Sequence, residues 1–198
     1  MRRRTAIGIL IALLLGPVGS AGAAESYDID QRFGAIAFTV RNFGMFHTDG
    51  SFRRFTGHLT IDEAHPGNTH VLVVIDMTSL ATRWAEAANM LRGETYFDIA
   101  HFPQAQFESV SVTLTAPGQY DVAGRLTLRG VTQPILLHAA LIDRHPSATP
   151  GAEDADFVIT GDLRRSAFGM TADRTFVADR VDLRINARIR LEAPSHAG

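Results

Sequence analysis

Eight histidines are the residues of this chain best suited to binding a metal ion or moving a proton. No two of them have the H-x-H or H-x-x-x-H spacing that places two ligands side by side on a strand or a helix. The chain has no cysteine, which excludes thiolate chemistry and cysteine-ligated zinc. We therefore expect surface histidines rather than a metal site. They are His47, His58, His65, His70, His101, His138, His145 and His196.

A carboxylate pair is the other arrangement that could support acid–base chemistry. Four acids are candidates, but nothing in their spacing brings two of them together. No segment matches G-x-S-x-G, a Walker loop or H-E-x-x-H. We predict no catalytic residue and no enzymatic activity. The four acids are Asp76, Glu94, Asp98 and Glu108.

Arg165 is the most distinctive charged residue. It precedes Phe168-Gly169 in an irregular stretch, and a loop arginine beside an aromatic ring can lie partly buried. We expect it to hold Asp98 or Glu94 and to close one end of the fold. Contact with a ligand is the alternative.

Alternating apolar and polar residues indicate the strands that must position these side chains. Residues 119–128 and 135–141 predict a β-hairpin, because apolar residues recur at every second position and Arg129-Gly130 interrupts them. The stretch 181–191 is the most regular strand, with apolar side chains on one face and mostly charged ones on the other. Further strands are expected at 26–30, 35–40, 51–62, 71–75, 104–114 and 157–163.

The segments between these strands are less regular. Residues 85–91 are helix formers and predict one short helix that ends at Gly93. Residues 42–50 are punctuated by glycine and are expected to form a loop or bend. Gly57 lies inside the strand expected at 51–62, where a missing side chain indicates a bulge or a barrel corner.

About eight strands and one short helix predict an all-β fold. Polar outer faces favour antiparallel pairing, and eight such strands can close into a barrel that holds side chains or one slender ligand. A two-sheet sandwich is the alternative. Several strands are long and apolar, and only closure removes both sheet edges, so we favour an eight-stranded antiparallel barrel.

The N-terminus has the pattern of a secretory signal peptide. Three arginines at 2–4 precede an apolar run at 6–15 that is too short to span a bilayer, and Ala21-Gly22-Ala23 offers a cleavage site. We expect residues 1–24 to be removed on export to the periplasm and residues 25–198 to form one domain, with an uncleaved anchor as the alternative. Loss of three arginines moves the net charge from −2 to −5, which argues against nucleic-acid binding.

Aromatic side chains are concentrated near the strand ends and the helix. Ordinary core packing is the simpler explanation, and a lined tunnel for an apolar chain is the alternative. A lipid buried in such a tunnel would be stabilised by about 0.8 kcal/mol per CH₂ before ordering costs. The aromatic residues are Phe33, Phe38, Phe43, Phe46, Phe52, Phe55, Trp84, Tyr96, Phe97, Phe102, Phe107, Phe157, Phe168 and Phe176.

Several short motifs occur in a recognisable order between residues 26 and 191. They are Ser79-Leu80-Ala81-Thr82, the run from Leu91 to Asp98 followed by Phe102-Pro103 and Phe107-Glu108-Ser109, the run from Gly124 to Thr132, the run from Arg165 to Met170, and Ala178 to Val181. In these motifs the chain resembles the YceI-like family of bacterial polyisoprenoid-binding proteins, over nearly the whole mature length.

The resemblance implies a lipocalin-like, eight-stranded barrel in the periplasm that encloses a long isoprenoid, such as a quinone tail or a polyprenyl phosphate. Amide-type lipids are bound by some members, and the family brings no catalytic residues. Two positions depart from its pattern: Asn42 stands where His is frequent, and Gly93 where Ser is usual. If that His contacts the ligand head group, this chain prefers a different head group or binds less selectively.

We therefore expect a periplasmic carrier or store that encloses a polyisoprenoid or another long-chain lipid, with no other cofactor. The head group is expected near Arg165, Asn42 or the helix end. A structural or stress-related interaction module with a side-chain-filled barrel is the alternative, and an enzyme acting on a bound lipid is a third. Candidate partners besides the lipid are the inner membrane, through transient contact, and a second copy in a homodimer.

The residues predicted to bind the ligand come from the strands, the helix and the Arg165 segment. Five of them are expected to line or gate the mouth of the tunnel: Trp84, Met90, Leu91, Phe97 and Phe168. The other predicted ligand-binding residues are Phe38, Val40, Asn42, Phe43, Phe55, Phe107, Leu126 and Arg165.

Overall fold

The computed structural model describes residues 25–29, 31–61 and 66–192. The predicted signal peptide, residues 1–24, lies outside this part of the chain. Within the described ranges, no helix has the length and apolar character needed to cross a membrane.

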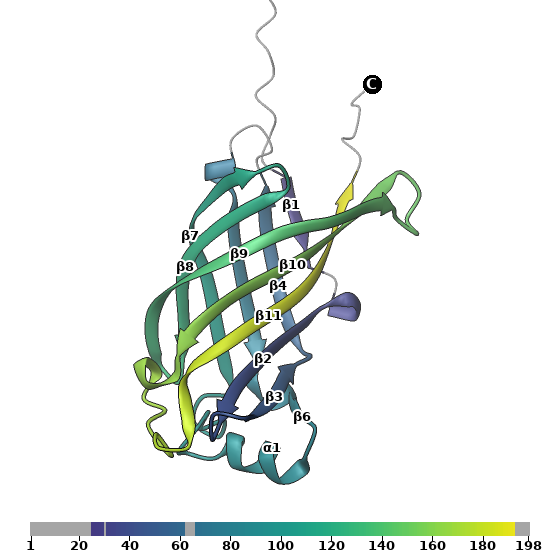
Figure 1. Cartoon of the computed structure of the whole chain (residues 1–198). Helices are drawn as coiled ribbons and strands as arrows, with labels where there is room; N and C mark the ends of the chain where they lie inside the picture. Colours follow the sequence, from purple (N-terminus) through teal and green to yellow (C-terminus); the bar gives the residue numbers. More distant parts are fainter. Residues whose placement is uncertain (1–24, 30, 62–65, 193–198) are drawn as a thin grey trace, which may run out of the picture.

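The described residues form one curled antiparallel sheet of eleven strands (Figure 1). Its strand order is β1-β4-β5-β7-β8-β9-β10-β11-β2-β3-β6. A single sheet excludes the two-sheet sandwich, and the predicted antiparallel barrel with one short helix is confirmed. The described residues form eleven strands rather than the eight expected, because β3, β4 and the short β1 and β6 are separate strands. The strands are β1 Glu25–Asp28, β2 Ala35–Asn42, β3 Phe46–Phe52, β4 Phe55–Ile61, β5 His70–Asp76, β6 Leu80–Thr82, β7 Gln104–Ala116, β8 Gln119–Leu128, β9 Val131–Pro146, β10 Ala152–Arg164 and β11 Val177–Glu192, and the helix is α1 Ala85–Arg92.

Closure of the sheet depends on the first strand. β1 pairs with β4, and Ile29, just after it, forms a bridge with Ile189 of β11. The Ile29 amide also donates to the Gly57 carbonyl, 3.0 Å away. A Cβ at Gly57 would lie 2.5 Å from the Ile29 side chain, so the glycine makes room for the closing residue. Of the two features expected at Gly57, a bulge or a barrel corner, the bulge is wrong, because the β4–β5 register continues past the glycine.

The hairpin predicted around Arg129-Gly130 is confirmed. β8 and β9 pair from Leu128↔Val131 onward across a two-residue turn. Arg129 and Gly130 have φ angles of 52° and 72°, as a type I′ turn requires. A Cβ at Gly130 would approach the Phe102 ring to 2.9 Å, so this turn packs directly on the segment after α1.

The segment 42–50 differs from its prediction as a loop. Only residues 43–45 turn the chain, and β3 begins at Phe46. The stretch His47-Thr48-Asp49 lacks apolar alternation, so its extended backbone is specified by pairing with β2 instead. The strand expected at 51–62 is likewise divided at Arg53-Arg54 into β3 and β4.

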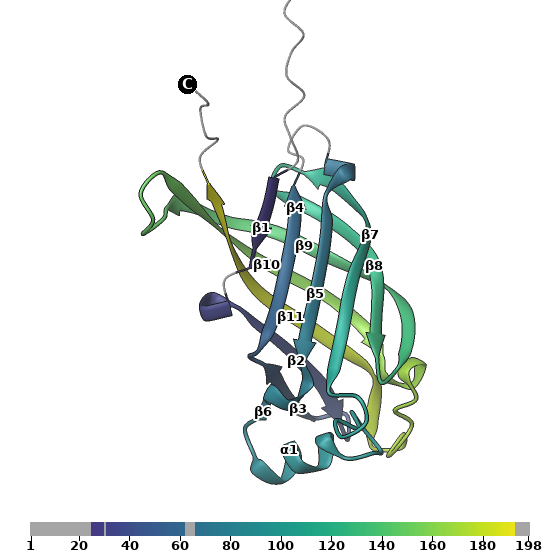
Figure 2. The same cartoon turned by 180° about the vertical axis from the view of Figure 1, so that it is seen from behind.

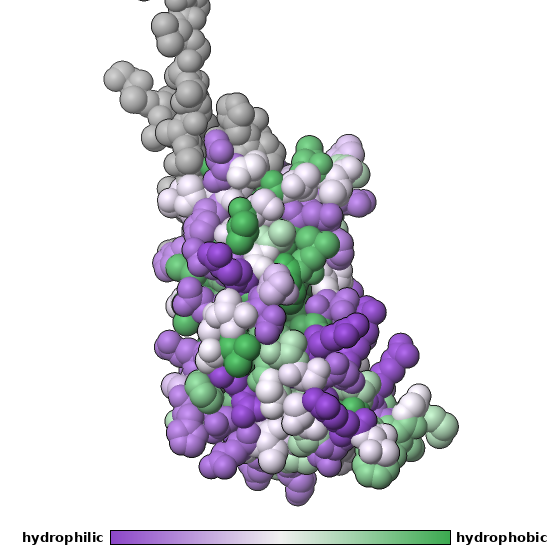
Figure 3. All heavy atoms as spheres, turned by 90° about the vertical axis from the view of Figure 1, so that its left-hand side faces the viewer, coloured by the Kyte–Doolittle hydropathy of each residue, from purple (hydrophilic) through white to green (hydrophobic). Residues whose placement is uncertain are grey.

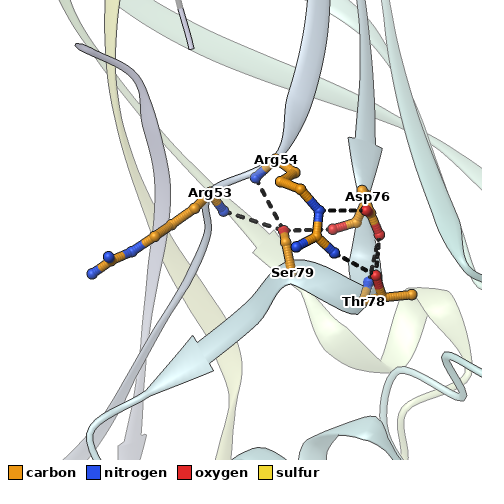
Figure 4. A network of polar contacts seen from close by, with 5 residues as sticks. All are labelled: Arg53, Arg54, Asp76, Thr78 and Ser79. Atoms are coloured by element: carbon orange, nitrogen blue, oxygen red, sulfur yellow. Dashed lines mark hydrogen bonds and ion pairs between the residues drawn. The ribbon is translucent and has the colours of Figure 1, made fainter. Parts of the chain in front are cut away.

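A network of polar contacts fixes the corner where β3 passes into β4 (Figure 4). The Ser79 hydroxyl accepts hydrogen bonds from the amides of Arg53 and Arg54, at 3.2 and 3.1 Å. The Arg54 Nε donates to Asp76 at 2.8 Å, and Asp76 also accepts from the Thr78 hydroxyl at 2.6 Å. Hydrogen bonds from Thr78 and Arg54 hold the pKa of Asp76 below its ordinary value.

The outer wall carries much of the chain's charge, with hydrophilic and hydrophobic residues interspersed (Figure 3). On its β9–β10–β11 side, Arg188 makes a bidentate pair with Asp156, at 2.6 and 2.7 Å. His145 lies 3.5 Å from the same carboxylate. The Arg188 hydrogen bond is the main cause of the lowered pKa of Asp156.

Candidate ligand-binding site

The barrel encloses a cavity of about 520 Å³. This volume lies in the range of small-molecule binding sites. Every long strand contributes inward-facing side chains, because successive residues of a strand point to opposite faces of the sheet. In the described part of the chain these side chains are almost all apolar and include no His, Asp or Glu; the polar ones are Thr69, Tyr96, Tyr120, Arg144 and Arg165.

The end of the cavity next to α1 is densely packed with aromatic rings. Phe38, Phe52 and Phe97 form a triangle with ring centroids 5.6–5.8 Å apart. All three rings are buried, and Phe97 meets the other two edge-on. Edge-to-face contacts of this kind add to the stability gained from burial alone. We refer to this region, with α1 and the segments 93–103 and 165–177, as the α1 end.

The segment after α1 folds into a compact cap over this end. The amides of Phe97, Asp98 and Ile99 donate to carbonyls of Leu91, Gly93 and Arg92 at 2.9–3.1 Å. Asp98 has a φ of 50° and is buried, and its carboxylate lies 2.8 Å from His101 Nδ1. That contact raises the pKa of His101.

Arg165 lies at the α1 end and is only 3% exposed. Its guanidinium donates to three backbone carbonyls, those of Met170, Val177 and Ala178, at 2.9–3.0 Å. The prediction that Arg165 holds Asp98 or Glu94 is wrong, because its guanidinium donates to main-chain carbonyls instead. Arg165 therefore fixes the segment 165–177 against the start of β11, and part of its side chain faces the cavity.

Tyr96 connects the two capping segments. Its hydroxyl donates to Asp173 at 2.7 Å across a sequence separation of 77 residues. Burial and, secondarily, this hydrogen bond raise the pKa of Tyr96 to about 12. The phenol therefore stays protonated near neutral pH and holds the segment 93–103 against the segment 165–177.

The opposite end of the cavity is more polar and more exposed. We call it the far end and define it by Ile61, Thr69, Tyr120, Arg144 and Phe157, which all line the cavity. None of them is buried, and Arg144 is exposed. Arg144 pairs with the lining residue Ala155 across β9 and β10, which places the guanidinium stem on the inner side of the sheet.

The structure places most of the predicted ligand-binding residues on the cavity wall. Phe168 is buried in the adjoining core but lies outside the lining. Ligand contact at all of these positions stays a prediction. The lining ones are Phe38, Val40, Phe55, Leu91, Phe97, Phe107, Leu126 and Arg165.

The remaining predicted positions face away from the cavity. Asn42 donates its side-chain amide to the Thr48 hydroxyl at 2.6 Å, so it belongs to the β2–β3 hairpin. Phe43, Trp84 and Met90 are exposed. Because the inward face of α1 is formed by Ala88 and Leu91, Met90 points outward. Of the residues expected to gate the mouth, only Leu91 and Phe97 face the cavity.

Other lining residues were absent from the predicted set. Val181, Leu183 and Ile185 lie on the apolar face of β11, and the alternation of that strand could have identified them. Met77 continues the period-two pattern of β5 by one step. Tyr96 lies in an irregular segment, where no periodic signal exists.

The described histidines are engaged mainly with single carboxylates. His138 lies 2.7 Å from Asp121, and His47 lies 3.2 Å from Asp49, both on exposed parts of the sheet. Among residues 25–29, 31–61 and 66–192, no three His, Asp or Glu side chains gather in a group that could hold a metal ion.

Comparison with known proteins agrees with this architecture. Residues 27–189 match the model of the YceI-like domain. A UPF0312 protein of Yersinia pestis (strain Pestoides F) is 35% identical over 185 residues, which cover 92% of this chain and 95% of that protein. The UPF0312 protein of Yersinia enterocolitica has the same identity and coverage.

Two solved structures share the fold at lower sequence identity. BcnA of Burkholderia cenocepacia superposes with a TM-score of 0.69 at 21% identity, covering 81% of this chain and 98% of that one. A polyisoprenoid binding domain from Saccharophagus degradans superposes with a TM-score of 0.57 at 19% identity, covering 85% and 98%. The match over residues 27–189 and the 35% identity along nearly the full length show that this chain belongs to the YceI-like family.

Proposed function

We propose that this protein is a periplasmic carrier or store that encloses a long apolar lipid chain, an isoprenoid in the first instance. The observation that carries the proposal is the apolar cavity of about 520 Å³ that runs inside the barrel. The likeness to a domain described as polyisoprenoid binding supports the choice of lipid class. Export to the periplasm is supported by the signal-peptide pattern of residues 1–24.

The cavity also suggests how a lipid lies in it. Three donors of Arg165 are already bound to carbonyls, and the rest of the α1 end is aromatic and aliphatic. This end suits the hydrocarbon tail, at about 0.8 kcal/mol per buried CH₂ before ordering costs. Thr69, Tyr120 and Arg144 offer hydrogen-bond donors at the far end, which suits a polar head group.

The sequence leaves two other functions open, a structural module and an enzyme. A barrel filled by its own side chains would leave no cavity, so the enclosed volume disfavours a purely structural module. An enzyme acting on a bound lipid would need a general acid or base on the wall. The described lining offers only Tyr96 and Tyr120 as hydroxyl groups of that kind, and the pKa of Tyr96 is raised away from the working range.

Native mass spectrometry of the protein expressed with its N-terminal segment, followed by lipid extraction, tests the proposal. We expect a retained lipid that gives isoprenoid fragments. Ile185 faces the cavity and its neighbour Arg184 faces out, so Ile185→Trp should reduce the lipid-bound fraction and Arg184→Trp should not. A clean apo mass, together with no uptake of added quinone, would reject the carrier function and favour an interaction module.

A further inference from the structure

Four large apolar side chains protrude together at the α1 end. They belong to the β2–β3 turn, the first residue of β3 and the residue before β11. Their exposed fractions are 66% for Phe43, 83% for Met45, 65% for Phe46 and 51% for Phe176. We call this group the apolar tip. Exposed apolar residues are common singly, but a cluster of this size on one protrusion indicates an interaction site. Apolar residues protrude at the lower right of the molecule in Figure 3, at the α1 end.

The apolar tip is held in place by the backbone. Phe43 and Gly44 have φ angles of 51° and 71°, so the turn is tight and directs the side chains outward. The Phe43 amide donates to the Phe176 carbonyl at 2.7 Å, and the two rings are in contact at a tilt of 34°, with centroids 4.9 Å apart. Figures 1 and 2 both place the β2–β3 turn, the start of β11 and α1 at the same end of the barrel. Little ordering is therefore needed for the tip to bind.

The apolar tip adjoins the cavity wall. Val40 and Val177 line the cavity, whereas Phe43 and Phe176, just beyond the ends of the same strands, face out. The register of β2 and β11 shifts between Val177 and Val181, so pairing is interrupted at this point. A surface that takes up the tip would therefore touch the end of the barrel that holds the lipid tail in the proposed function.

Arg41 and Arg174 flank the tip. Neither Arg41 nor Arg174 forms an ion pair within the described residues. The nearby carboxylates are engaged: Asp49 accepts from Thr39 and Asp173 accepts from Tyr96. Arginines beside protruding apolar side chains suit the phosphate and acyl layers of a bilayer surface.

Trp84 and Arg83, just before α1, also combine an exposed apolar ring with an arginine. The Trp84 ring is exposed, and the Arg83 guanidinium lies 5.4 Å from its centroid. Tryptophan is enriched at the level of lipid head groups, and arginine binds their phosphates. The acid of α1, Glu86, lies one turn from the outward Met90, so the helix itself is less suited to insertion than the turn.

We infer that the apolar tip, flanked by Arg41 and Arg174, docks this protein on the surface of a lipid bilayer that contains anionic lipids. The inference rests on the proposed function for its cargo, because a lipid carrier must meet a membrane. The tip is convex, which suits insertion between head groups, whereas a protein partner for it would have to supply a matching groove.

Vesicle sedimentation of the full-length mature chain tests the inference, with vesicles of phosphatidylcholine alone and with added phosphatidylglycerol. The double variant Phe43→Ser/Phe46→Ser should lower the vesicle-bound fraction by about tenfold for each ring. Arg41→Gln/Arg174→Gln should lower binding to the anionic vesicles only, by about fivefold for each arginine. The matched control is Val110→Ser/Ile142→Ser on the outer wall, where the exposed fractions are similar at 64% and 62%, and it should bind like wild type.

Three results would overturn the inference: no binding of the wild type to either vesicle, equal loss in the outer-wall control, or wild-type binding by the Phe43/Phe46 variant. Sedimentation velocity without vesicles adds a fourth. If the wild type is a dimer and the tip variant a monomer, the tip is a self-association surface instead. Cargo retention is measured separately by native mass spectrometry, so loss of docking with lipid retained is distinguishable from failure of the carrier function.

Discussion

The two ends of the barrel are built in different ways. At the α1 end, a triangle of buried rings, the Arg165 hydrogen bonds and the Tyr96–Asp173 contact fill and brace the interior. At the far end, the lining residues are half-buried or exposed and include three polar side chains. The comparison teaches that the same alternation of inward residues gives a buried, closely packed cavity wall where loops cap the barrel and a more exposed, more polar wall at the opposite end.

This difference also separates stability from binding. Residues at the α1 end contact many buried neighbours, so their loss leaves cavities or unsatisfied groups. Residues at the far end already face free volume, so their loss costs less. We therefore expect mutations at the α1 end to lower the free energy of unfolding and mutations at the far end to act mainly on ligand affinity.

The largest expected effect comes from Arg165. Arg165→Met keeps the volume but leaves the carbonyls of Met170, Val177 and Ala178 without their donor. We expect a loss of about 3–5 kcal/mol in the free energy of unfolding, measured by urea denaturation. The neighbouring exposed Arg164→Met is the control and should change stability by less than about 0.5 kcal/mol. Similar losses in both variants would contradict the bracing role of Arg165.

The paired truncation of one aromatic ring at each end tests the comparison directly. Phe97→Ala removes a buried ring that contacts Phe38 and Phe52, and should cost about 3–4 kcal/mol. Phe157→Ala removes a half-buried ring that meets Tyr120 at 6.4 Å, and should cost about 1–2 kcal/mol. Equal costs in thermal or urea unfolding would show that the far end is packed as tightly as the α1 end.

A smaller effect is expected from Tyr96→Phe, which removes the hydroxyl bound to Asp173. The loss should be about 1 kcal/mol near neutral pH. The pKa of Tyr96 in the folded state, about 12, lies above that of an unfolded tyrosine, 10.0. The unfolded chain therefore loses this proton first, so wild-type stability should fall between pH 10 and 12.

The decrease in the free energy of unfolding at high pH tests the raised pKa of Tyr96. Urea denaturation at a series of pH values should show a steeper decline for wild type than for Tyr96→Phe between pH 10 and 12. Ultraviolet absorbance should show that one tyrosine forms its phenolate at a higher pH than the others. Parallel pH profiles of the two proteins would refute the shifted titration.

The smallest expected effects come from two surface carboxylates. Asp76 braces the corner near the α1 end and Asp156 pairs with Arg188 on the outer wall. Asp156→Asn should cost about 0.5–1 kcal/mol, and Asp76→Asn about 0.2–0.5 kcal/mol, because Asp76 is more exposed.

The contributions of Asp76 and Asp156 to the free energy of unfolding should depend on pH. The pKa of each carboxyl is lowered in the folded state, so its stabilisation is present above the ordinary aspartate pKa. It is lost as the pH falls through the lowered value. The difference in unfolding free energy between wild type and each Asn variant should therefore shrink in acid, and a difference that persists at pH 2 would show that the carboxylate charge is not its source.

The sequence predicted the fold more completely than it predicted the ligand-binding site. The β8–β9 hairpin and β11 follow strict alternation, and α1 is a run of helix formers, so their local pattern and tertiary role agree. β3 could not be predicted, because its polar residues are extended only through pairing with β2. Phe107 and Leu126, two of the predicted ligand-binding residues, line the cavity, since a strand's period fixes the side to which each residue points.

The sequence by itself determined which residues alternate, where the tight turns lie and that the chain carries the YceI-like motifs. Those are local properties, set by side-chain period and by the conformations open to glycine. The tertiary structure alone decided that Arg165 binds carbonyls rather than acids, that Tyr96 reaches Asp173, and that Phe43 faces out while Val40 faces in. Each of these depends on which segments meet when the sheet closes at Ile29, and contacts between distant segments are not encoded in the spacing of neighbours.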